Sequence, residues 1–141
     1  MIRYFNLALE CALPVVIHCR DAFEDLYSIA EQEFPKGKAL LHCFTGTLEE
    51  ALRGVEKGWL VSFSGIVTFK RSEDLRKVAK EVPLNHIVIE TDTPYLAPQS
   101  MRGKPNEPSF IRETAQTIAN VKGISLKEVG KMKFLSHLQL F

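Results

Sequence analysis

Two histidines and two carboxylates stand at the ends of short apolar runs, where a protein can use them for metal chemistry. His18 and His42 each close such a run, and a third run leads into Glu90 and Asp92. Imidazole and carboxylate groups suit divalent cations such as Zn²⁺, Mn²⁺ and Mg²⁺. The residue types therefore predict a metal site that needs no thiolate ligand.

The placement of these residues favours metal binding over a structural role. A single histidine at a strand end is more often a hydrogen-bonded structural group, but His18 and His42 have the same placement. Glu90 and Asp92 are two residues apart, so in a strand they share one face. One carboxylate can bind a cation while the other supports a ligand's outer nitrogen. We assign Asp92 as a ligand and Glu90 as the supporting or auxiliary group.

The elements that carry these residues alternate between strand and helix. Apolar runs bounded by turn residues indicate strands covered on both faces, as in a parallel sheet. The predicted strands are 14–18, 39–43, 59–63 and 86–91, and the predicted helices are 2–11, 22–33, 47–57, 72–81, 109–121 and one from 125. Right-handed crossovers place the helices outside the sheet, and ligands bind at the carboxyl ends of the strands.

Two helix starts carry a sequence signature. Thr47 and Ser125 are each followed three residues later by glutamate, which predicts a capping box, and Asp21 is the expected N-cap of the helix from 22. Four strands fit either a small open sheet or half of a (β/α)₈ barrel, whose full length is ~250 residues. Because Met1 leads directly into a helical stretch with no preceding strand, the half-barrel is favoured.

The composition bounds the class of protein but not its activity. The chain has 141 residues, 45% of them hydrophobic, and a net charge of +1, so no bulk field attracts nucleic acid. Its three cysteines are an odd number without metal-site spacing, which indicates thiols in a reducing compartment. No run is long enough to span a bilayer, and a cytoplasmic protein without membrane contact is expected.

Five segments resemble the TatD family of metal-dependent deoxyribonucleases in order and spacing. They are PVVIHCRDA (14–22), LLHCFTGT (40–47), VSFSGIVTFK (61–70), IVIETDTPYLAP (87–98) and RGKPNEP (102–108). The resemblance implies the last four strands of a (β/α)₈ barrel of the metallo-dependent hydrolase type. It also implies a site for two divalent metal ions and hydrolysis of DNA, often as a 3′ exonuclease.

The resemblance also implies a role for each site residue. His18 and His42 correspond to two ligands of one metal, and Asp92 to a ligand of the other metal that also orients the attacking water. The family's His-x-His pair and a further glutamate have no counterpart here. We therefore expect residues 1–141 to form one partial domain, inactive or impaired by itself. A non-catalytic truncated product and an interaction module that reuses the half-barrel remain alternatives.

Several residues near the predicted strand ends are candidates for substrate contacts. Arg20, Arg102 and Lys104 suit phosphate, although solvated surface charge is the simpler interpretation. The candidates for stacking on unpaired bases are Phe44, Phe69 and Tyr95. The expected partner is DNA, for which single-stranded ends are a candidate form.

The first and last predicted strands lack a neighbour on one side. Each would expose unpaired N–H and C=O groups, which favours association. We therefore expect either a homo-oligomer or a complementing half-chain. Asn106 and Glu107 are expected to fix the long loop that follows the last strand, and His86 and His137 are expected to be structural.

Overall fold

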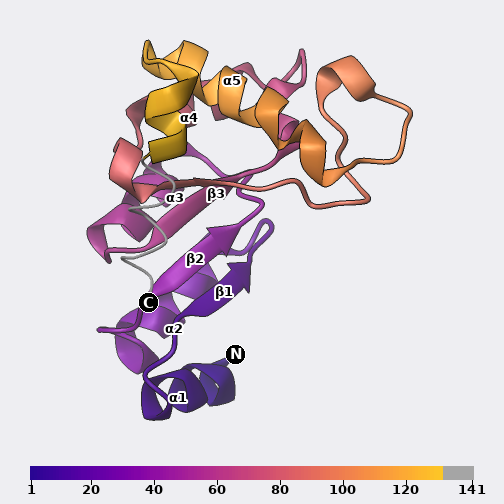
Figure 1. Ribbon diagram of the computed structural model, residues 1–141. Coiled ribbons are helices and arrows are strands. Elements are labelled where there is room, and N and C mark those ends of the chain that lie inside the picture. The colour runs from indigo at the N-terminus through magenta and orange to yellow at the C-terminus, as the bar shows by residue number, and fades with distance from the viewer. Residues whose placement is uncertain (132–141) are drawn as a thin grey trace.

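The strands form one parallel sheet in the order β1-β2-β3-β4, so each strand lies beside its neighbour in sequence (Figure 1). The computed structural model describes residues 1–131. The strands are β1 (Val15–His18), β2 (Ala39–His42), β3 (Leu60–Phe63) and β4 (Ile87–Ile89). The predicted sheet, its order and its parallel direction are confirmed.

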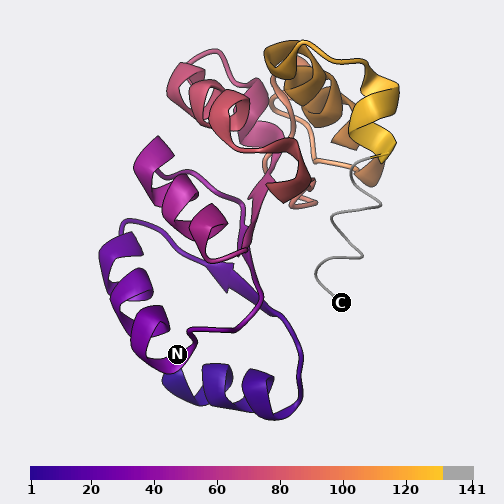
Figure 2. The same ribbon diagram turned by 90° about the vertical axis from the view of Figure 1, so that its left-hand side faces the viewer.

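Helices precede, connect and follow the strands, along the outer side of the curved sheet (Figure 2). The α-helices are α1 (Ile2–Glu10), α2 (Phe23–Glu33), α3 (Leu48–Glu56), α4 (Glu73–Glu81) and α5 (Ile111–Lys122), and residues 126–131 are also helical. The short 3₁₀ helices are η1 (Gly65–Thr68), η2 (Leu84–His86), η3 (Gln99–Met101) and η4 (Pro108–Phe110). No helix in residues 1–131 is long and apolar enough to cross a membrane.

The hydrophobic core lies between the sheet and these helices. Because successive strand residues point to opposite faces, one set of alternate side chains faces the helices. That set is buried and includes Ile17, Leu41, Val61, Phe63 and Ile89. The other face of the sheet is less completely covered: Val16 is 62% exposed there. His18 and His42 lie on this second face, so the predicted site residues lie away from the core.

The helix starts agree with the sequence in two of three cases. Thr47 forms a complete capping box with Glu50, and Ser125 exchanges hydrogen bonds with Glu128 in the same way. The prediction for Asp21 is wrong, because its φ is +56° and Ala22 is the N-cap residue of α2. The left-handed turn at Asp21 carries the chain from the sheet to the helix without a side-chain cap.

The last strand is shorter than predicted. It begins at Ile87, because η2 includes His86, whose Nδ1 lies 2.9 Å from the carbonyl oxygen of Trp59. That contact supports a structural role for His86, whereas His137 lies outside the described residues. Glu90 follows the strand and still donates its backbone N–H to the carbonyl of Phe63 at 3.0 Å. Pairing between β3 and β4 thus continues up to the candidate site.

Candidate functional site

His18 and His42 lie side by side at the carboxyl ends of β1 and β2. They are partners in the parallel register of these strands, and their ring centroids are 6.0 Å apart with the planes tilted by 51°. Parallel strands in register place such pairs on the same face. The sheet therefore brings the two predicted imidazole ligands together.

Glu90 holds His42 in a defined orientation. Its Oε2 lies 2.7 Å from His42 Nδ1, and its Oε1 accepts a hydrogen bond from the backbone N–H of Cys43 at 2.5 Å. An ionised carboxylate can only accept, so Nδ1 of the imidazole must carry the proton. In the neutral ring this leaves the lone pair of Nε2 free to bind a cation. Glu90 thus makes the contact that the sequence predicted for an auxiliary carboxylate.

Asp92 faces the other nitrogen of the same ring. Its Oδ1 lies 3.3 Å from His42 Nε2. Two ligand atoms of one tetrahedral cation, each bonded at ~2.1 Å, are separated by ~3.4 Å. The two atoms are therefore close enough to bind one ion or two neighbouring ions, which in two-metal sites lie ~3.5–4 Å apart. Within residues 1–131, however, no group of three His, Cys, Asp or Glu side chains could hold a metal ion. The donor types fit a divalent cation, and the chain supplies part of a ligand set.

Unusual backbone conformations flank this cluster. Cys43 has a φ of +47° and Asp92 a φ of +60°, a region that residues other than glycine seldom adopt. Such strain is characteristic of functional sites, where surrounding contacts must offset it. Here one such contact is the hydrogen bond from Cys43 N–H to Glu90.

The segment after β4, residues 93–108 and here called the β4 loop, is anchored beside the site by a buried amide. Asn106 is 3% exposed and donates from Nδ2 to the carbonyls of Thr91 and Tyr95, each at 2.6 Å. Its Oδ1 accepts from the backbone N–H of Glu107 at 2.9 Å. The loop-fixing role predicted for Asn106 is confirmed, and it secures the backbone on both sides of Asp92.

The thiols beside the site are not poised for chemistry. Burial raises the pKa of the Cys43 thiol, and the neighbouring carboxylates Asp92 and Glu90 raise it further, although its hydrogen bond with Ser64 acts in the opposite direction. Burial also raises the pKa of Cys19. Both side chains therefore stay protonated at neutral pH, whereas nucleophilic attack requires the thiolate.

The sequence predicted no role in the site for the buried hydroxyl of Ser62. Ser62 lies on β3, one residue beyond the Leu41–Val61 pair and so beside His42. It is fully buried, and its Oγ has no hydrogen-bond partner among the described residues. A serine within an otherwise apolar strand was the signal that could have drawn attention to it.

The predicted substrate contacts lie in different environments. Arg20 follows β1 with 80% of its side chain exposed, 3.8 Å from the carboxylate of Asp21. Tyr95 is 72% exposed, and Lys104 is also exposed. The guanidinium of Arg102 lies over the ring of Phe69, 4.3 Å from its centroid, so one face of that ring is occupied.

The prediction that Phe44 stacks on bases is wrong. Its side chain is 2% exposed and packs in the core against Phe23 and Phe63, with centroid distances of 5.3 and 6.4 Å. The left-handed turn at Cys43 interrupts the alternation of the strand just before Phe44. Sequence spacing gave no indication of that turn.

The support that Glu90 gives to His42 can be tested by Glu90→Gln. Both partners of this carboxylate require an acceptor, and an amide offers only one, so we expect His42 to lose its Nδ1–H tautomer or Cys43 N–H to lose its bond. Ring ¹⁵N shifts of His42 would report the tautomer directly. We also expect divalent metal to bind ~10- to 100-fold more weakly by calorimetry. Glu107→Gln, an exposed carboxylate outside the cluster, is the control, and an unchanged tautomer in Glu90→Gln would contradict this role.

Comparison with known proteins agrees with this geometry. All 141 residues match the family model described as TatD related DNase. The metal-dependent hydrolase YcfH of Escherichia coli K12 is 39% identical over 141 residues, covering 99% of this chain and 53% of that protein. The 3′-5′ ssDNA/RNA exonuclease TatD of Erwinia tasmaniensis is 37% identical over 141 residues, covering 96% of this chain and 54% of that protein. The chain spans about half the length of these relatives.

Two solved structures of TatD proteins also match this chain over about half of their own length. The crystal structure of YjjV, a TatD homologue from E. coli K12, matches with a TM-score of 0.89 and 25% identity, over 97% of this chain and 53% of that one. A TatD-family hydrolase from Entamoeba histolytica matches with a TM-score of 0.85 and 24% identity, over 99% of this chain and 54% of that one. The four strands and their helices are thus half of a TatD-type barrel. Its sequence and its fold together place this chain in the family of TatD-related DNases.

Proposed function

We propose that this chain contributes half of the active site of a metal-dependent nuclease that removes nucleotides from the 3′ end of a nucleic acid strand. The observation that carries the proposal is the arrangement around His42, with Glu90 on Nδ1 and Asp92 Oδ1 at 3.3 Å from Nε2. Family membership supports hydrolysis, and one relative named as a 3′-5′ ssDNA/RNA exonuclease supports the nucleic acid substrate.

Each residue of the cluster has a part in the proposed reaction. His18 and His42 would hold one divalent ion (Zn²⁺, Mn²⁺ or Mg²⁺), and Asp92 would hold the second. A divalent ion supplies Lewis acidity for phosphodiester hydrolysis. Asp92 would also accept a hydrogen bond from the attacking water and align it. Glu90 would keep the His42 ring in place while charge develops on the phosphate.

Groups around the cluster would position the strand. Arg20, Arg102 and Lys104 would contact backbone phosphates, since guanidinium groups match phosphate oxygens in pairs and ammonium groups act as point charges. The exposed ring of Tyr95 would stack on an unpaired base. We place the reaction in the cytoplasm, whose reducing conditions keep the free thiols Cys11, Cys19 and Cys43 reduced.

The second half of the site would come from another polypeptide segment. Residues 1–131 hold no group of three potential metal ligands, and the matched relatives are about twice as long. A segment carrying the family's first four strands, or a second copy of this chain, would have to complete it. The lack of a three-ligand group among residues 1–131 also favours an alternative, a non-catalytic interaction module that reuses the half-barrel.

A complementation assay separates these proposals. The chain would be mixed with a polypeptide that carries the family's first four strands, taken from YcfH, and incubated with Mn²⁺ and a 5′-labelled single-stranded oligonucleotide. We expect a ladder of products shortened from the 3′ end in the mixture, little cleavage by either part alone, and none in EDTA. Cleavage by neither part nor the mixture, despite a stable complex, would refute the nuclease proposal and favour the interaction module.

A further inference from the structure

Two loops at the carboxyl end of the sheet are joined to each other by hydrogen bonds and close packing. One is the β4 loop, and the other is the segment after β3, residues 64–72, here called the β3 loop. Thr68 Oγ1 accepts a hydrogen bond from Gln99 N at 2.8 Å, and Lys70 N donates to Gln99 Oε1 at 3.1 Å. At Gly65 an added Cβ would lie 2.2 Å from the carbonyl oxygen of Leu96, so only glycine allows this approach.

Two arginines further fix the β3 loop. Arg76, on α4, donates to the carbonyls of Val67 at 3.0 Å, Phe69 at 2.7 Å and Lys70 at 3.3 Å. From the β4 loop, Arg102 lies over the Phe69 ring at 4.3 Å, within the range of a cation–π interaction. The backbone of the β3 loop and the guanidinium of Arg102 are therefore held in place before any ligand arrives, which lowers the ordering cost of binding.

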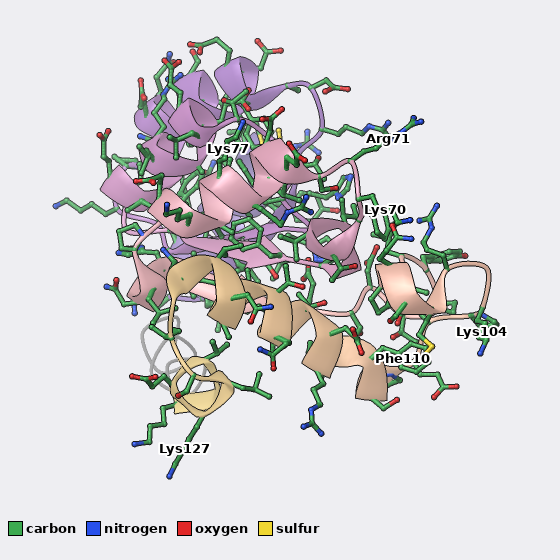
Figure 3. All side chains as sticks on the ribbon, turned by 90° about the horizontal axis from the view of Figure 1, so that it is seen from above. Lys70, Arg71, Lys77, Lys104, Phe110 and Lys127 are labelled. Atoms are coloured by element: carbon green, nitrogen blue, oxygen red, sulfur yellow. The ribbon has the colours of Figure 1, made fainter. Side chains whose placement is uncertain are left out.

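The two loops concentrate positive charge. They carry four exposed cations, Lys70, Arg71, Arg102 and Lys104, here called the cationic rim, and a single carboxylate, Glu107. Their net charge is +3 in a chain whose total is +1, so the rest of the chain is net −2. Figure 3 shows Lys70, Arg71 and Lys104 on one side of the molecule, with Lys127 on the opposite side.

The cations of the rim are not neutralised by neighbouring carboxylates. In the part of the chain that the structure describes, none of the four lies within 4.0 Å of an acidic group. By contrast, Arg53 on α3 and Lys77 on α4 both form ion pairs at distances of 2.7 and 2.8 Å. The rim thus keeps its charge available for an anionic partner.

We propose that the cationic rim is a binding surface for the phosphate backbone of a single-stranded nucleic acid, several nucleotides away from the cleavage point. The proposal rests on the nuclease function proposed above and adds the surface that holds the uncleaved part of the strand. Lys70 and Arg71, to which the sequence assigned no role, are its new members. Along the sequence, Tyr95 lies between Asp92 and the rim residues Arg102 and Lys104.

Exposure of Tyr95 favours a single strand over a duplex. Among residues 1–131, eight large hydrophobic side chains are exposed, and Tyr95 is the one that lies outside residues 1–16. An exposed ring on the same loop as Arg102 and Lys104 suits unpaired bases, which can stack on it, whereas the bases of a duplex are already stacked.

Salt-dependent binding tests the rim without any catalysis. Fluorescence anisotropy of a labelled oligo(dT) of about 20 nucleotides would be measured in EDTA. We expect the double substitution Lys70→Ala with Arg71→Ala to weaken binding ~10-fold at ~0.1 M salt and to reduce the slope of log K against log [salt] by ~1.4. The control, Lys127→Ala with Lys131→Ala, makes the same charge change on an exposed helix and should alter affinity less than about 2-fold.

Further measurements separate the contribution of base stacking to binding from that of charge. Tyr95→Ala should weaken binding ~10-fold while leaving the salt slope unchanged. Oligo(U) should bind as oligo(dT) does, and a duplex of the same length more weakly. Equal losses in the rim and control variants, or tighter binding of the duplex, would overturn the proposal. The binding assay in EDTA does not depend on metal or on cleavage. If the complementation assay shows no cleavage but the anisotropy results are as expected, the nuclease function is contradicted and the rim proposal is not.

Discussion

Asp92→Asn is expected to lower metal-dependent cleavage by the complemented protein by ~10³-fold or more. The substitution removes the charged oxygen that lies 3.3 Å from His42 Nε2 and leaves an amide of almost the same shape. A neutral amide oxygen binds a divalent cation less strongly and cannot take a proton from water. The initial rate of 3′ shortening of a labelled oligonucleotide at saturating Mn²⁺ is the measurement.

Asp21→Asn provides the matched control. Asp21 also follows a strand of the sheet, but its side chain is 94% exposed and pairs only with Arg20, at 3.8 Å, among the described residues. Its loss should change the rate less than about 2-fold, because an exposed ion pair contributes little. Anisotropy in EDTA should be the same for both variants. Cleavage that survives Asp92→Asn would show that the catalytic carboxylate lies elsewhere.

The isolated chain is expected to self-associate, and Val16→Asp is expected to reduce that association strongly. Within residues 1–131, β1 pairs with β2 on one side only. Among the residues that the structure describes, seven of the eight exposed large hydrophobic side chains lie between Met1 and Val16. Four of them line a groove of about 300 Å³ between α1 and β1, namely Tyr4, Leu7, Leu13 and Val16. Unpaired strand edges and contiguous apolar surface both favour association, and two copies supply eight strands.

Sedimentation velocity at tens of micromolar would measure this association. Val16 is 62% exposed at the centre of the edge strand, so a carboxylate there would have to be buried unpaired in any assembly that uses this edge. Tyr95→Asp is the control, since Tyr95 is also a large exposed side chain but lies on the β4 loop. The complementing half should compete with self-association. A monomeric wild-type chain with slow amide exchange in residues 15–18 and 87–89 would contradict this expectation.

The parts of the fold that local sequence determines were predictable. Apolar runs located all four strands, and the Thr47 and Glu50 pair located the start of α3, because these signals act over a few residues. The strand ends that carry His18 and His42 followed from the same runs.

Features that depend on left-handed turns or on contacts between distant loops were not predictable. The turn at Cys43 buries Phe44, and the turn at Asp21 replaces the expected cap. Neither position is a glycine, the residue that most readily adopts a positive φ. Likewise, the hydrogen bond from Lys70 N to Gln99 Oε1 joins residues that are 29 positions apart in the sequence.

The hydrogen bond between Glu90 and His42 makes the site responsive to sheet curvature. Glu90 follows β4 and His42 ends β2, so the carboxylate reaches across the intervening strand β3. In a flat sheet these strands would be ~9.6 Å apart, and bending toward the open face shortens that span. In the proposed complete barrel, the radius would fix the angle at which Glu90 holds His42 and so the direction in which His42 presents Nε2. Assembly of the barrel would thereby set the orientation of the His42 ring as well as supply the remaining ligands.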